Sequence, residues 1–375
     1  MPVPPPFYLD RAQIPWDYYC MDLDFFAQSL AEICGRSLVS PGRPLHCTVI
    51  VNPVSGGFTI RSRWKSHLQA LNEYRQKALS NAERAVYKDV NMILTEGKGS
   101  CGEITKSLID EAEKEPGPFY LIISAGGDGT HCEAMYALYS APAHVRSNMA
   151  ILRLPMGTGN DGADSALLAG ALELLIKPVH TEFAPAVQLI TSHGGPASGK
   201  GPYLAFNILS VGLDAYVTHM TNKMKGNVPG DSYKLWVDIA ALFYDSLYKV
   251  DFLDVRALDE QNREVLSFRE KLLLLAMGVC GRRTYGSQQN ILPDGRNVCG
   301  IRQMPVHRKL AIKGLVARGA HINSPEARLF NAHRLEFSGS HPILAQMDGE
   351  TVLLQPEDFP SAMELTAPVI PLLKM

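Results

Sequence analysis

Short apolar runs alternate with amphipathic helical segments from His46 to about residue 180. The runs typical of buried strands are 47–51, 90–94, 119–124 and 150–154, and the segments with helical spacing are 62–83, 100–114 and 131–140. This alternation of strand and helix predicts an α/β domain with a doubly wound parallel sheet. In such a sheet, ligands bind at the carboxyl ends of the strands.

The pattern changes after about residue 180, where short β-rich runs follow one another. We expect strands at 186–190, 203–209, 252–258, 271–279, 309–317, 334–339 and 362–367. One long helical segment, 231–248, interrupts them. These features predict an antiparallel β-sandwich as a second, C-terminal domain.

Residues 1–45 precede both patterns. A proline-rich start is followed by helical spacing from Leu23 to Ile33, and Gly35 is a typical helix stop. The sequence therefore predicts three parts: an N-terminal extension (1–45), an α/β domain (46–180) and a β-sandwich domain (181–375).

Composition excludes several classes of protein. The formal net charge of −2 argues against a nucleic-acid groove, which needs a basic face. The seven cysteines form no CxxC pair, so we expect reduced thiols in a cytoplasmic protein. The first 20 residues do not have the apolar core of a secretory signal. The longest apolar stretch, Leu272–Cys280, is too short to span a bilayer, so any membrane contact is expected to be peripheral.

Three glycine-containing turns follow predicted strands of the α/β domain, at 48–57, 121–130 and 152–161. Because parallel strands end at one edge of the sheet, we expect the three turns to converge on one ligand. Glycine lets a phosphate approach the backbone closely, and a helix N-terminus favours negative charge. Asp128 in the second turn would repel a phosphate, so it suits a shared magnesium ion or a proton transfer. The pattern predicts nucleotide phosphate chemistry.

Other interpretations of these turns are open or excluded by the sequence. There is no Walker-type GxxxxGK[ST], and no GxGxxG opens the first helix. Thr130 and Glu133 have the spacing of a capping box, so Glu133 could simply close the N-terminus of its helix. His131-Cys132-Glu133 lacks the PCxxC partner of a zinc deaminase.

Together these motifs resemble the diacylglycerol kinase catalytic-domain superfamily, which includes bacterial lipid kinases, sphingosine kinases and ceramide kinases. The similar segments are Asn52–Gly56, Gly126–Thr130 with Glu133, Pro155–Asp161, 206–215, 285–295 and Met347–Glu350, in the order expected for the family. The resemblance runs from about residue 46 to the end of the chain.

The resemblance implies a lipid kinase that uses ATP and Mg²⁺, with 46–180 binding ATP and 181–375 binding the acceptor. The ATP-contacting residues it implies are Asn52, Pro53, Val54, Ser55, Gly56, Thr95, Gly126, Gly127, Asp128, Gly129, Thr130, Glu133, Gly157, Thr158 and Asn160. The predicted metal ligands are Asp128 and Asp161. The predicted catalytic residues are Asp128, Asp348 and Glu350, with Glu350 as the proton acceptor in an interdomain cleft.

The sequence departs from the family pattern in three places. Gly162–Asp164 replaces an aromatic residue and an arginine, and only Glu182 could stand in for an aspartate that opens the second domain. Cys299 occupies the place of an aspartate that helps to hold a structural magnesium, and cysteine is a poor magnesium ligand.

Three hypotheses follow, of which the first is a lipid kinase. Its acceptor would be diacylglycerol, a sphingoid base or another long-chain alcohol. Lys223–Lys225 and the aromatic segment from Trp236 to Tyr248 are candidates to face lipid at a membrane surface. NAD kinase, which shares the GGDG loop, is the second hypothesis, and a catalytically inactive nucleotide-binding protein is the third. An exposed sandwich edge could pair two subunits as a homodimer.

Overall fold

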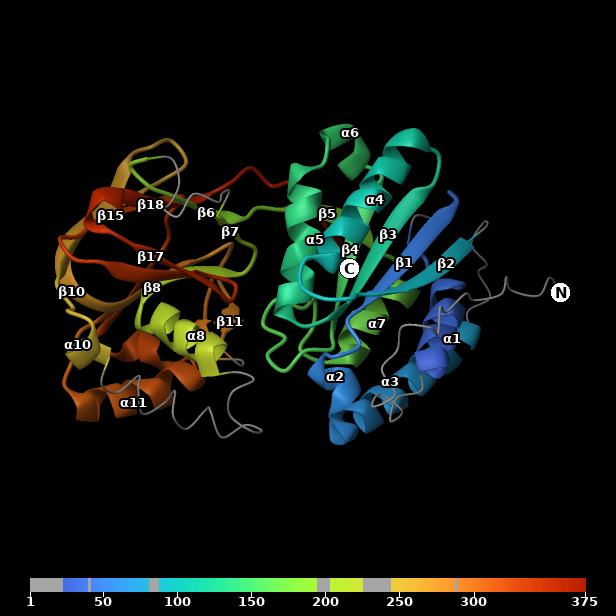
Figure 1. The fold of residues 1–375 in the computed structure, drawn as a ribbon, viewed down its shortest axis with the longest axis horizontal. Helices are drawn as coiled ribbons and strands as arrows, with labels where there is room; N and C mark the ends of the chain where they lie inside the picture. The colour runs from blue at the N-terminus through green and yellow to red at the C-terminus, as the bar shows by residue number, and fades with distance from the viewer. Residues whose placement is uncertain (1–22, 40–41, 81–87, 194–202, 225–243, 287–288) are drawn as a thin grey trace. The chain divides into compact units, whose positions relative to one another are not determined.

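The computed structural model describes residues 23–39, 42–80, 88–193, 203–224, 244–286 and 289–375. The chain divides into two compact units, one formed by residues up to 184 together with 368–375, the other by residues 185–367. Figure 1 shows the elements of both units. None of the described helices combines the length and apolar character needed to span a bilayer.

The first unit is built on a six-stranded sheet in the order β2-β1-β3-β4-β19-β5. Its strands are β1 (Leu45–Val51), β2 (Lys88–Leu94), β3 (Phe119–Gly126), β4 (Met149–Pro155), β5 (His180–Ala184) and β19 (Ile370–Lys374). The first four pair in parallel, β19 is parallel to β4, and β5 is antiparallel to β19. Every residue of β3 is buried, which explains its uninterrupted apolar run. The predicted parallel sheet is confirmed, with one antiparallel edge strand.

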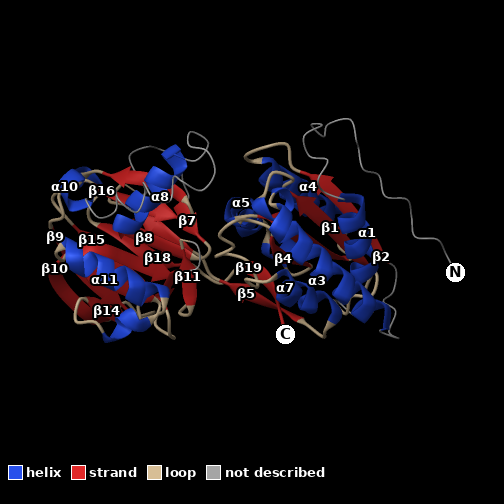
Figure 2. Ribbon diagram, turned by 90° about the horizontal axis from the view of Figure 1, so that it is seen from below, coloured by secondary structure: helices blue, strands red, loops and turns tan. Residues whose placement is uncertain are grey.

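Helices cover both faces of this sheet. They are α1 (Leu23–Cys34), α2 (Gly56–Thr59), α3 (Arg61–Ser80), α4 (Ser100–Lys114), α5 (Asp128–Ser140), α6 (Ala143–Arg146) and α7 (Leu168–Ile176). Helices α1, α3 and α7 share one hydrophobic cluster with the strands, whereas α4 and α5 pack on each other and on β3. Figures 1 and 2 show the two sets on opposite faces, which is the predicted doubly wound arrangement.

Helix α1 is an integral part of the first unit, although the sequence places it in an extension. Phe26 is fully buried, and its ring meets that of Phe58 edge-on with 5.1 Å between centroids. Arg75 of α3 donates to both carboxylate oxygens of Glu32 at 2.5 and 2.7 Å. The helix and its end before Gly35 are as predicted; residues 1–22 lie outside the described ranges.

The end of the chain returns to the first unit. Strand β19 lies between β4 and β5, and Ile370, Leu372 and Leu373 are buried there. The first unit therefore extends to residue 184 and also includes 368–375, which differs from the predicted division at 180 and 181–375. A pairing between strands almost two hundred residues apart leaves no signal in local sequence pattern.

The second unit contains an 11-stranded sheet in which all described pairings are antiparallel. Its strands are β6 (Val187–Ile190), β7 (Tyr203–Ala205), β8 (Ile208–Gly212), β9 (Phe252–Leu258), β10 (Glu264–Gly278), β13 (Val298–Arg302), β14 (Ala327–Phe330), β15 (Arg334–Ser338), β16 (Ile343–Met347), β17 (Glu350–Leu354) and β18 (Ser361–Leu365). A separate hairpin is formed by β11 (Arg283–Tyr285) and β12 (Gln289–Leu292). The predicted antiparallel C-terminal domain is confirmed.

The 15-residue strand β10 belongs to two halves of this sheet. Its first half pairs with β9, and its second half pairs with β8 and β13. One hydrophobic cluster contains Val255 and Phe337 from one half and Val211 and Ala345 from the other. The two halves therefore face each other across a shared core, as in a sandwich.

Two elements of the second unit differ from the prediction. Residues 309–317, predicted as a strand, lie in helix α11 (Val306–Ala317), where Ile312 and Val316 pack inward one turn apart. Helix α8 (Leu213–Met224) was not predicted. The predicted helix 231–248 lies largely outside the described residues, and α10 (Tyr244–Leu247) is the described part of it.

Candidate active site

The carboxyl ends of β1 and β3 are neighbours, although β2 follows β1 in the chain. The chain leaves β1 for β2 on one side of it and returns to β3 on the other, so the strand order reverses at this point. Doubly wound sheets bind ligands at such a switch point. The loops that leave β1 and β3 here are the first two glycine turns found in the sequence.

Asn52 joins these two turns. Its backbone N–H donates to the carbonyl of Ala125 at 2.9 Å, and its side-chain amide donates to Thr130 Oγ1 at 3.1 Å. One asparagine thus fixes the turn after β1 to the N-terminal turn of α5. This convergence was predicted from the parallel order of the strands.

The third turn, after β4, meets the other two. The N–H of Gly57 donates to the carbonyl of Met156 at 2.7 Å, and the Arg63 guanidinium donates to the carbonyl of Gly157 at 2.7 Å. A Cβ on Gly157 would lie 2.5 Å from Gly127 Cα, so this approach requires glycine. Arg63 was missed in the sequence because no motif includes it; its place in the first turn of α3, after the β1 loop, was the available signal.

The three glycine turns together form one surface, which we call the platform. Two carboxylates lie at its centre. Asp128 is the first residue of α5, and its Oδ1 accepts the N–H of Gly162 at 2.7 Å. A Cβ on Gly159 would lie 3.0 Å from Asp128 Oδ2 and 3.3 Å from Asp161 Oδ2, so both carboxylates flank the same glycine. Mg²⁺ is commonly held by one or two carboxylates together with water and substrate phosphates, so this pair fits the ion. Among the described residues there is no cluster of three or more His, Cys, Asp or Glu with the geometry of a metal site.

A buried histidine supports the second turn from behind. His131 is fully buried in α5, and its Nδ1 lies 2.8 Å from Ser124 Oγ of β3. Burial lowers the pKa of His131 to about 4, while the charge of Asp128 acts in the opposite direction. The imidazole is therefore neutral at neutral pH.

A buried ion pair supports the third turn. Arg153 of β4 and Asp164 are joined at 2.7 Å, with side chains 3% and 2% exposed. The backbone N–H of Arg153 also donates to Asp164 Oδ2 at 2.7 Å. Asp164 lies in the segment where the sequence departs from the family pattern, and its pairing anchors the loop that carries Asp161 and Gly162. Sequence analysis did not find this pair because its members belong to different predicted elements.

Glu133 does not cap its own helix, so the predicted capping box is wrong. Helix α5 starts at Asp128 with Gly127 as its N-cap and no side-chain cap. Glu133 instead accepts the N–H groups of Gly99 at 2.7 Å and Cys101 at 3.2 Å, at the N-terminus of α4. A carboxylate is favourable at that end of a helix, and it joins α5 to the loop after β2.

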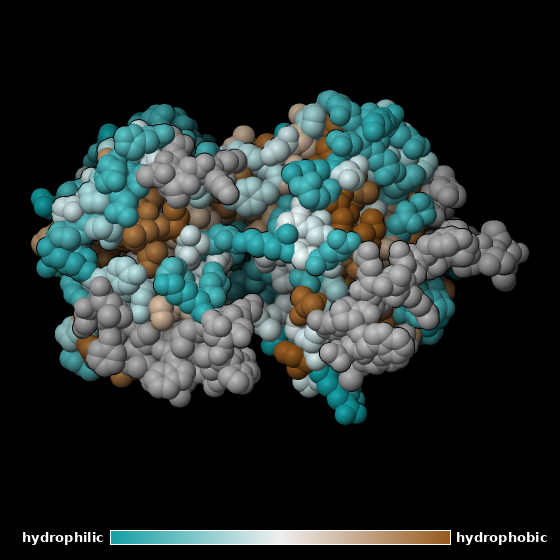
Figure 3. Space-filling view, viewed as in Figure 1, coloured by the Kyte–Doolittle hydropathy of each residue, from teal (hydrophilic) through white to brown (hydrophobic). Residues whose placement is uncertain are grey.

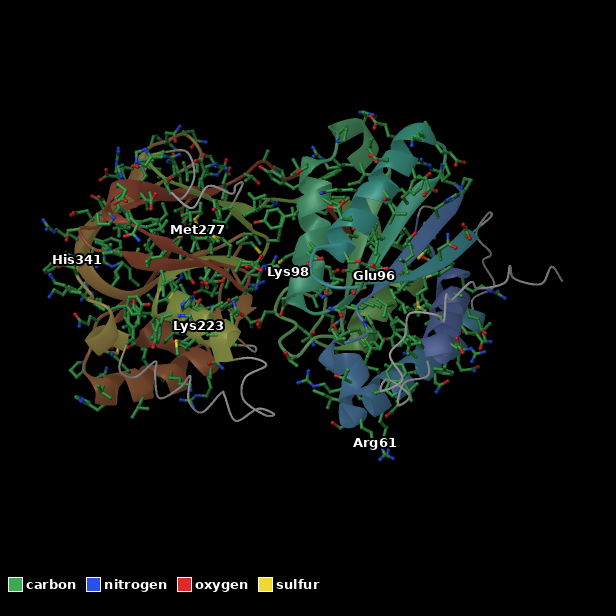
Figure 4. The ribbon with its side chains drawn as sticks, in the orientation of Figure 1. Arg61, Glu96, Lys98, Lys223, Met277 and His341 are labelled. Carbon is green, nitrogen blue, oxygen red and sulfur yellow. The ribbon has the colours of Figure 1, made fainter. Side chains whose placement is uncertain are left out.

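The loop after β2 contains Thr95, whose N–H donates to the carbonyl of Val51 at 2.8 Å. Glu96 and Lys98 follow on the same loop (Figure 4). The remaining predicted ATP-contacting residues lie at the carboxyl ends of β1, β3 and β4. The loop residues are Pro53, Val54, Ser55, Thr158 and Asn160; Gly126 ends β3, Gly56 begins α2, and Gly129 lies in the first turn of α5. The first unit thus contains the whole predicted ATP-contacting set.

Asp348 and Glu350 belong to the second unit, in the hairpin between β16 and β17. Met347 pairs with Glu350, and both turn residues between them have positive φ, 46° at Asp348 and 109° at Gly349. Such a two-residue turn is the usual use of Asp-Gly, as the sequence indicates. The turn places Glu350 as an exposed residue at the start of β17.

The carboxylate of Asp348 is hydrogen-bonded to the backbone of the segment that leads from β7 into β8. Its carboxylate accepts the N–H groups of Phe206, Asn207 and Ile208, the last at 3.0 Å. These hydrogen bonds hold the β16–β17 hairpin against that segment. The predicted location of Asp348 near magnesium stays a prediction. A meeting of Asp128 with Glu350 also stays a prediction, because Asp128 belongs to the first unit and Glu350 to the second.

Helix α8 holds the other side of the hairpin, and the segment 206–215 found in the sequence includes only its first three residues. Asn222 Nδ2 donates to the carbonyl of Gly349 at 2.7 Å, and His219 Nδ1 lies 3.3 Å from Thr351 Oγ1. Burial, aided by the charge of Lys223, lowers the pKa of His219. Glu350 therefore projects from a turn that is bonded on both sides.

Cys299 lies in a buried, apolar environment. Cys299 is fully buried in β13, and burial raises the pKa of its thiol to about 12. Asp294 is paired with Arg296, whose Nε lies 3.0 Å from the carboxylate, and this guanidinium lowers the pKa of Asp294. The departure noted in the sequence therefore corresponds to a neutral thiol in a hydrophobic cluster.

The fold defines a class of protein with two units. In one, an α/β unit, glycine turns meet at the switch point of the sheet, and the other is an antiparallel β unit. Residues 46–190 match the family model of the diacylglycerol kinase catalytic domain. The predicted resemblance to the superfamily is therefore confirmed.

Two curated relatives extend the similarity along most of the chain. It is 24% identical to "Diacylglycerol kinase" of Bacillus subtilis (strain 168) over 319 residues, which is 83% of this chain and 91% of the relative. It is 26% identical to "Probable lipid kinase YegS-like" of Pseudomonas fluorescens (strain Pf0-1) over 293 residues, which is 75% of this chain and 84% of the relative.

Solved structures share the fold. A crystal structure of a protein described as a diacylglycerol kinase from Bacillus anthracis str. Sterne superposes with a TM-score of 0.55 at 15% identity, covering 87% of this chain and 94% of that one. A second structure from the same organism superposes with a TM-score of 0.54, covering 87% of this chain and 96% of that one. Both structures are similar to this chain in fold.

Proposed function

We propose that this protein transfers the γ-phosphate of ATP to the hydroxyl of a lipid. The observation that carries the proposal is the single platform formed by the three glycine turns, with Asp128 and Asp161 flanking Gly159. Backbone N–H groups and glycines suit phosphates, and two carboxylates suit the cation that phosphates bring with them.

In this proposal the loops after β1 to β4 bind ATP, and Asp128 and Asp161 hold Mg²⁺. A bound Mg²⁺ would neutralise phosphate charge. Asn52 and Arg63 position the turns against one another, because Asn52 donates a hydrogen bond to Thr130 and Arg63 donates one to the carbonyl of Gly157. Arg63 also places a positive charge beside the third turn, where negative charge of the phosphates would lie.

Glu350 is the proposed proton acceptor for the attacking lipid hydroxyl. It is an exposed carboxylate on a rigid hairpin, and a general base must be held within hydrogen-bond reach of the proton it accepts. Asp348 positions this hairpin through its backbone hydrogen bonds. Transfer would need Glu350 to meet the platform of the first unit in an interdomain cleft.

A lipid acceptor is proposed from the relatives' names and from the surface of the second unit. Figure 3 shows apolar side chains gathered over β17, the strand that starts at Glu350, and Leu353 of this strand is 40% exposed. A diacylglycerol, a sphingoid base or another long-chain alcohol has the chemistry for this surface. We propose that the protein acts from the cytoplasm at a membrane surface.

The test is transfer of radiolabelled γ-phosphate from ATP and Mg²⁺ to a mixed lipid extract. Label should enter the organic phase, and Glu350→Gln and Asp128→Asn should each lower the rate by about a hundredfold or more. Glu357→Gln and Asp110→Asn, exposed carboxylates outside the site, serve as matched controls and should retain the rate.

Other outcomes would select the alternative functions. Label on a water-soluble dinucleotide, with none on lipid, would indicate an NAD kinase. ATP binding without transfer to either acceptor would indicate a nucleotide-binding protein that has lost catalysis. Equal rates for Glu350→Gln and the unmodified chain would reject Glu350 as the proton acceptor.

A further inference from the structure

The outward side of helix α11 has an unusual composition for a surface helix. Val306 is 43% and Leu310 56% exposed, and Ala311 and Ala317 are exposed as well. Ile312 is buried on the opposite side, where the helix packs on the second unit. A solvent-facing helix side normally carries polar and charged residues, so large apolar side chains at its centre need an explanation.

The charged residues of this region are all positive. No Asp or Glu occurs between Asp294 and Glu326, whereas six Lys or Arg do, in a chain whose formal net charge is −2. On α11 itself, Arg308 pairs with Glu326 and Lys309 pairs with Asp245. Lys313 and the adjoining Arg318 add two further cations, both on exposed residues.

The apolar and basic residues share one side of the helix. Val306, Leu310 and Ala317 are spaced by four and seven residues, and Lys313 follows Leu310 by three. Side chains at these spacings lie on one helical face. Figure 2 shows α11 at the periphery of the second unit, in front of its strands. Apolar and basic side chains on one exposed helix face are typical of a helix that lies in a membrane interface.

We propose that the outer face of α11 docks on an anionic lipid bilayer. The proposal rests on the proposed function, because a kinase that phosphorylates a bilayer lipid meets its acceptor at the membrane surface. Leu310 and Val306 enter the boundary between headgroups and acyl chains, while Lys313 and Arg318 contact anionic headgroups.

Charge also decides between lipid and other occupants of this face. A two-fold contact between copies of the chain would press together two faces that each carry Lys313 and Arg318, while α11 supplies no carboxylate to offset their charge. A nucleic-acid backbone would match the cations but leave Leu310 and Val306 without apolar contact. A bilayer with anionic headgroups satisfies both kinds of side chain.

The experiment is co-sedimentation of the full chain with vesicles of phosphatidylcholine, with or without phosphatidylglycerol. Binding should require phosphatidylglycerol and weaken with salt. Leu310→Glu should reduce binding by about tenfold or more, since it removes apolar contact and adds repulsion. Lys313→Gln with Arg318→Gln should reduce it by about 25-fold, roughly fivefold for each charge lost.

Matched controls test whether a loss of vesicle binding is specific to the outer face of α11 or follows from any change of surface charge or apolarity. Val265→Glu, at an exposed valine of β10, and Lys65→Gln with Lys114→Gln, on α3 and α4, should bind like the unmodified chain. Equal binding by Leu310→Glu would overturn the proposal. The proposal would also be overturned if light scattering showed self-association that depends on Leu310 while vesicle binding did not depend on Leu310.

Kinase activity distinguishes this inference from the proposed function. With a short-chain, water-soluble lipid acceptor, Leu310→Glu should keep the full rate of transfer while losing vesicle binding. Vesicle binding that depends on α11 in a chain without transfer activity would support the docking face and reject the kinase proposal. Transfer activity with vesicle binding indifferent to α11 would reject the face alone.

Discussion

Arg153 and Asp164 show how a single residue pair can stabilise the candidate site. Both side chains are almost completely buried, so removing one leaves the other as an uncompensated charge. We predict that Asp164→Ala lowers the free energy of unfolding by about 3–5 kcal/mol. Urea denaturation at neutral pH measures this change.

An exposed pair provides the matched control for Asp164. Lys106 and Glu103 lie 2.8 Å apart on α4, but their side chains are 60% and 74% exposed. Glu103→Ala should therefore change the free energy of unfolding by less than about 1 kcal/mol. Similar losses for the two substitutions would contradict a buried role for Asp164.

His131 predicts a pH dependence of stability. Its pKa in the folded protein is lowered to about 4 by burial, below its ordinary value of 6.5. The unfolded chain therefore binds a proton more readily between these values, and stability is lost as pH falls from about 6.5 toward 4. At pH 5 the loss relative to pH 7 should be roughly 2 kcal/mol for this group.

His131→Gln should remove that part of the acid sensitivity, measured as the difference in unfolding free energy between pH 7 and pH 5. His144→Gln is the control, because His144 is 71% exposed. If the unmodified chain and His131→Gln lose equal stability on acidification, then burial of this imidazole is not the cause.

At the scale of elements, α8 and the β16–β17 hairpin form one functional arrangement. Asn222 holds the Gly349 carbonyl, and Asp348 holds the segment between β7 and β8. We predict that Asn222→Ala lowers kcat for lipid phosphorylation about tenfold, with little change in KM for ATP, because Glu350 loses its fixed position. Steady-state kinetics with varied ATP measures both parameters.

Asn91→Ala, at an exposed position of β2, is the control for Asn222 and should retain kcat. A general loss of folding would lower the melting temperature of Asn222→Ala together with kcat. A normal melting temperature with normal kcat would show that α8 does not position Glu350.

At the scale of the whole molecule, the last strand completes the first unit. Strand β19 separates β4 from β5 and buries Ile370, Leu372 and Leu373. Truncation after Pro368 should remove a central strand pairing and about 1.5–3 kcal/mol for each buried side chain, so the first unit should become sensitive to proteolysis. Deletion of Met375 alone, which is 66% exposed, should leave the protease pattern unchanged. An unchanged pattern after the longer truncation would contradict this role.

Local pattern was sufficient for elements whose type is set by their own contiguous residues. The strand from Phe119, the helix from Ser100 and the Asp348–Gly349 turn follow from apolar runs, helical spacing and turn chemistry. It failed at residues 309–317, where a run of apolar residues suited strand and helix equally, and packing of Ile312 on the second unit selected the helix.

The sequence by itself determined the alternation of β1 to β4 with α3, α4 and α5, the three glycine turns and the family they resemble, because each depends on contiguous residues. Only the tertiary structure decided that Glu133 caps α4, that Asp164 pairs with Arg153, that α8 holds the Glu350 hairpin and that β19 completes the first sheet. These contacts join residues far apart in the chain. Their free energy depends on burial and geometry, which exist only once the chain has folded.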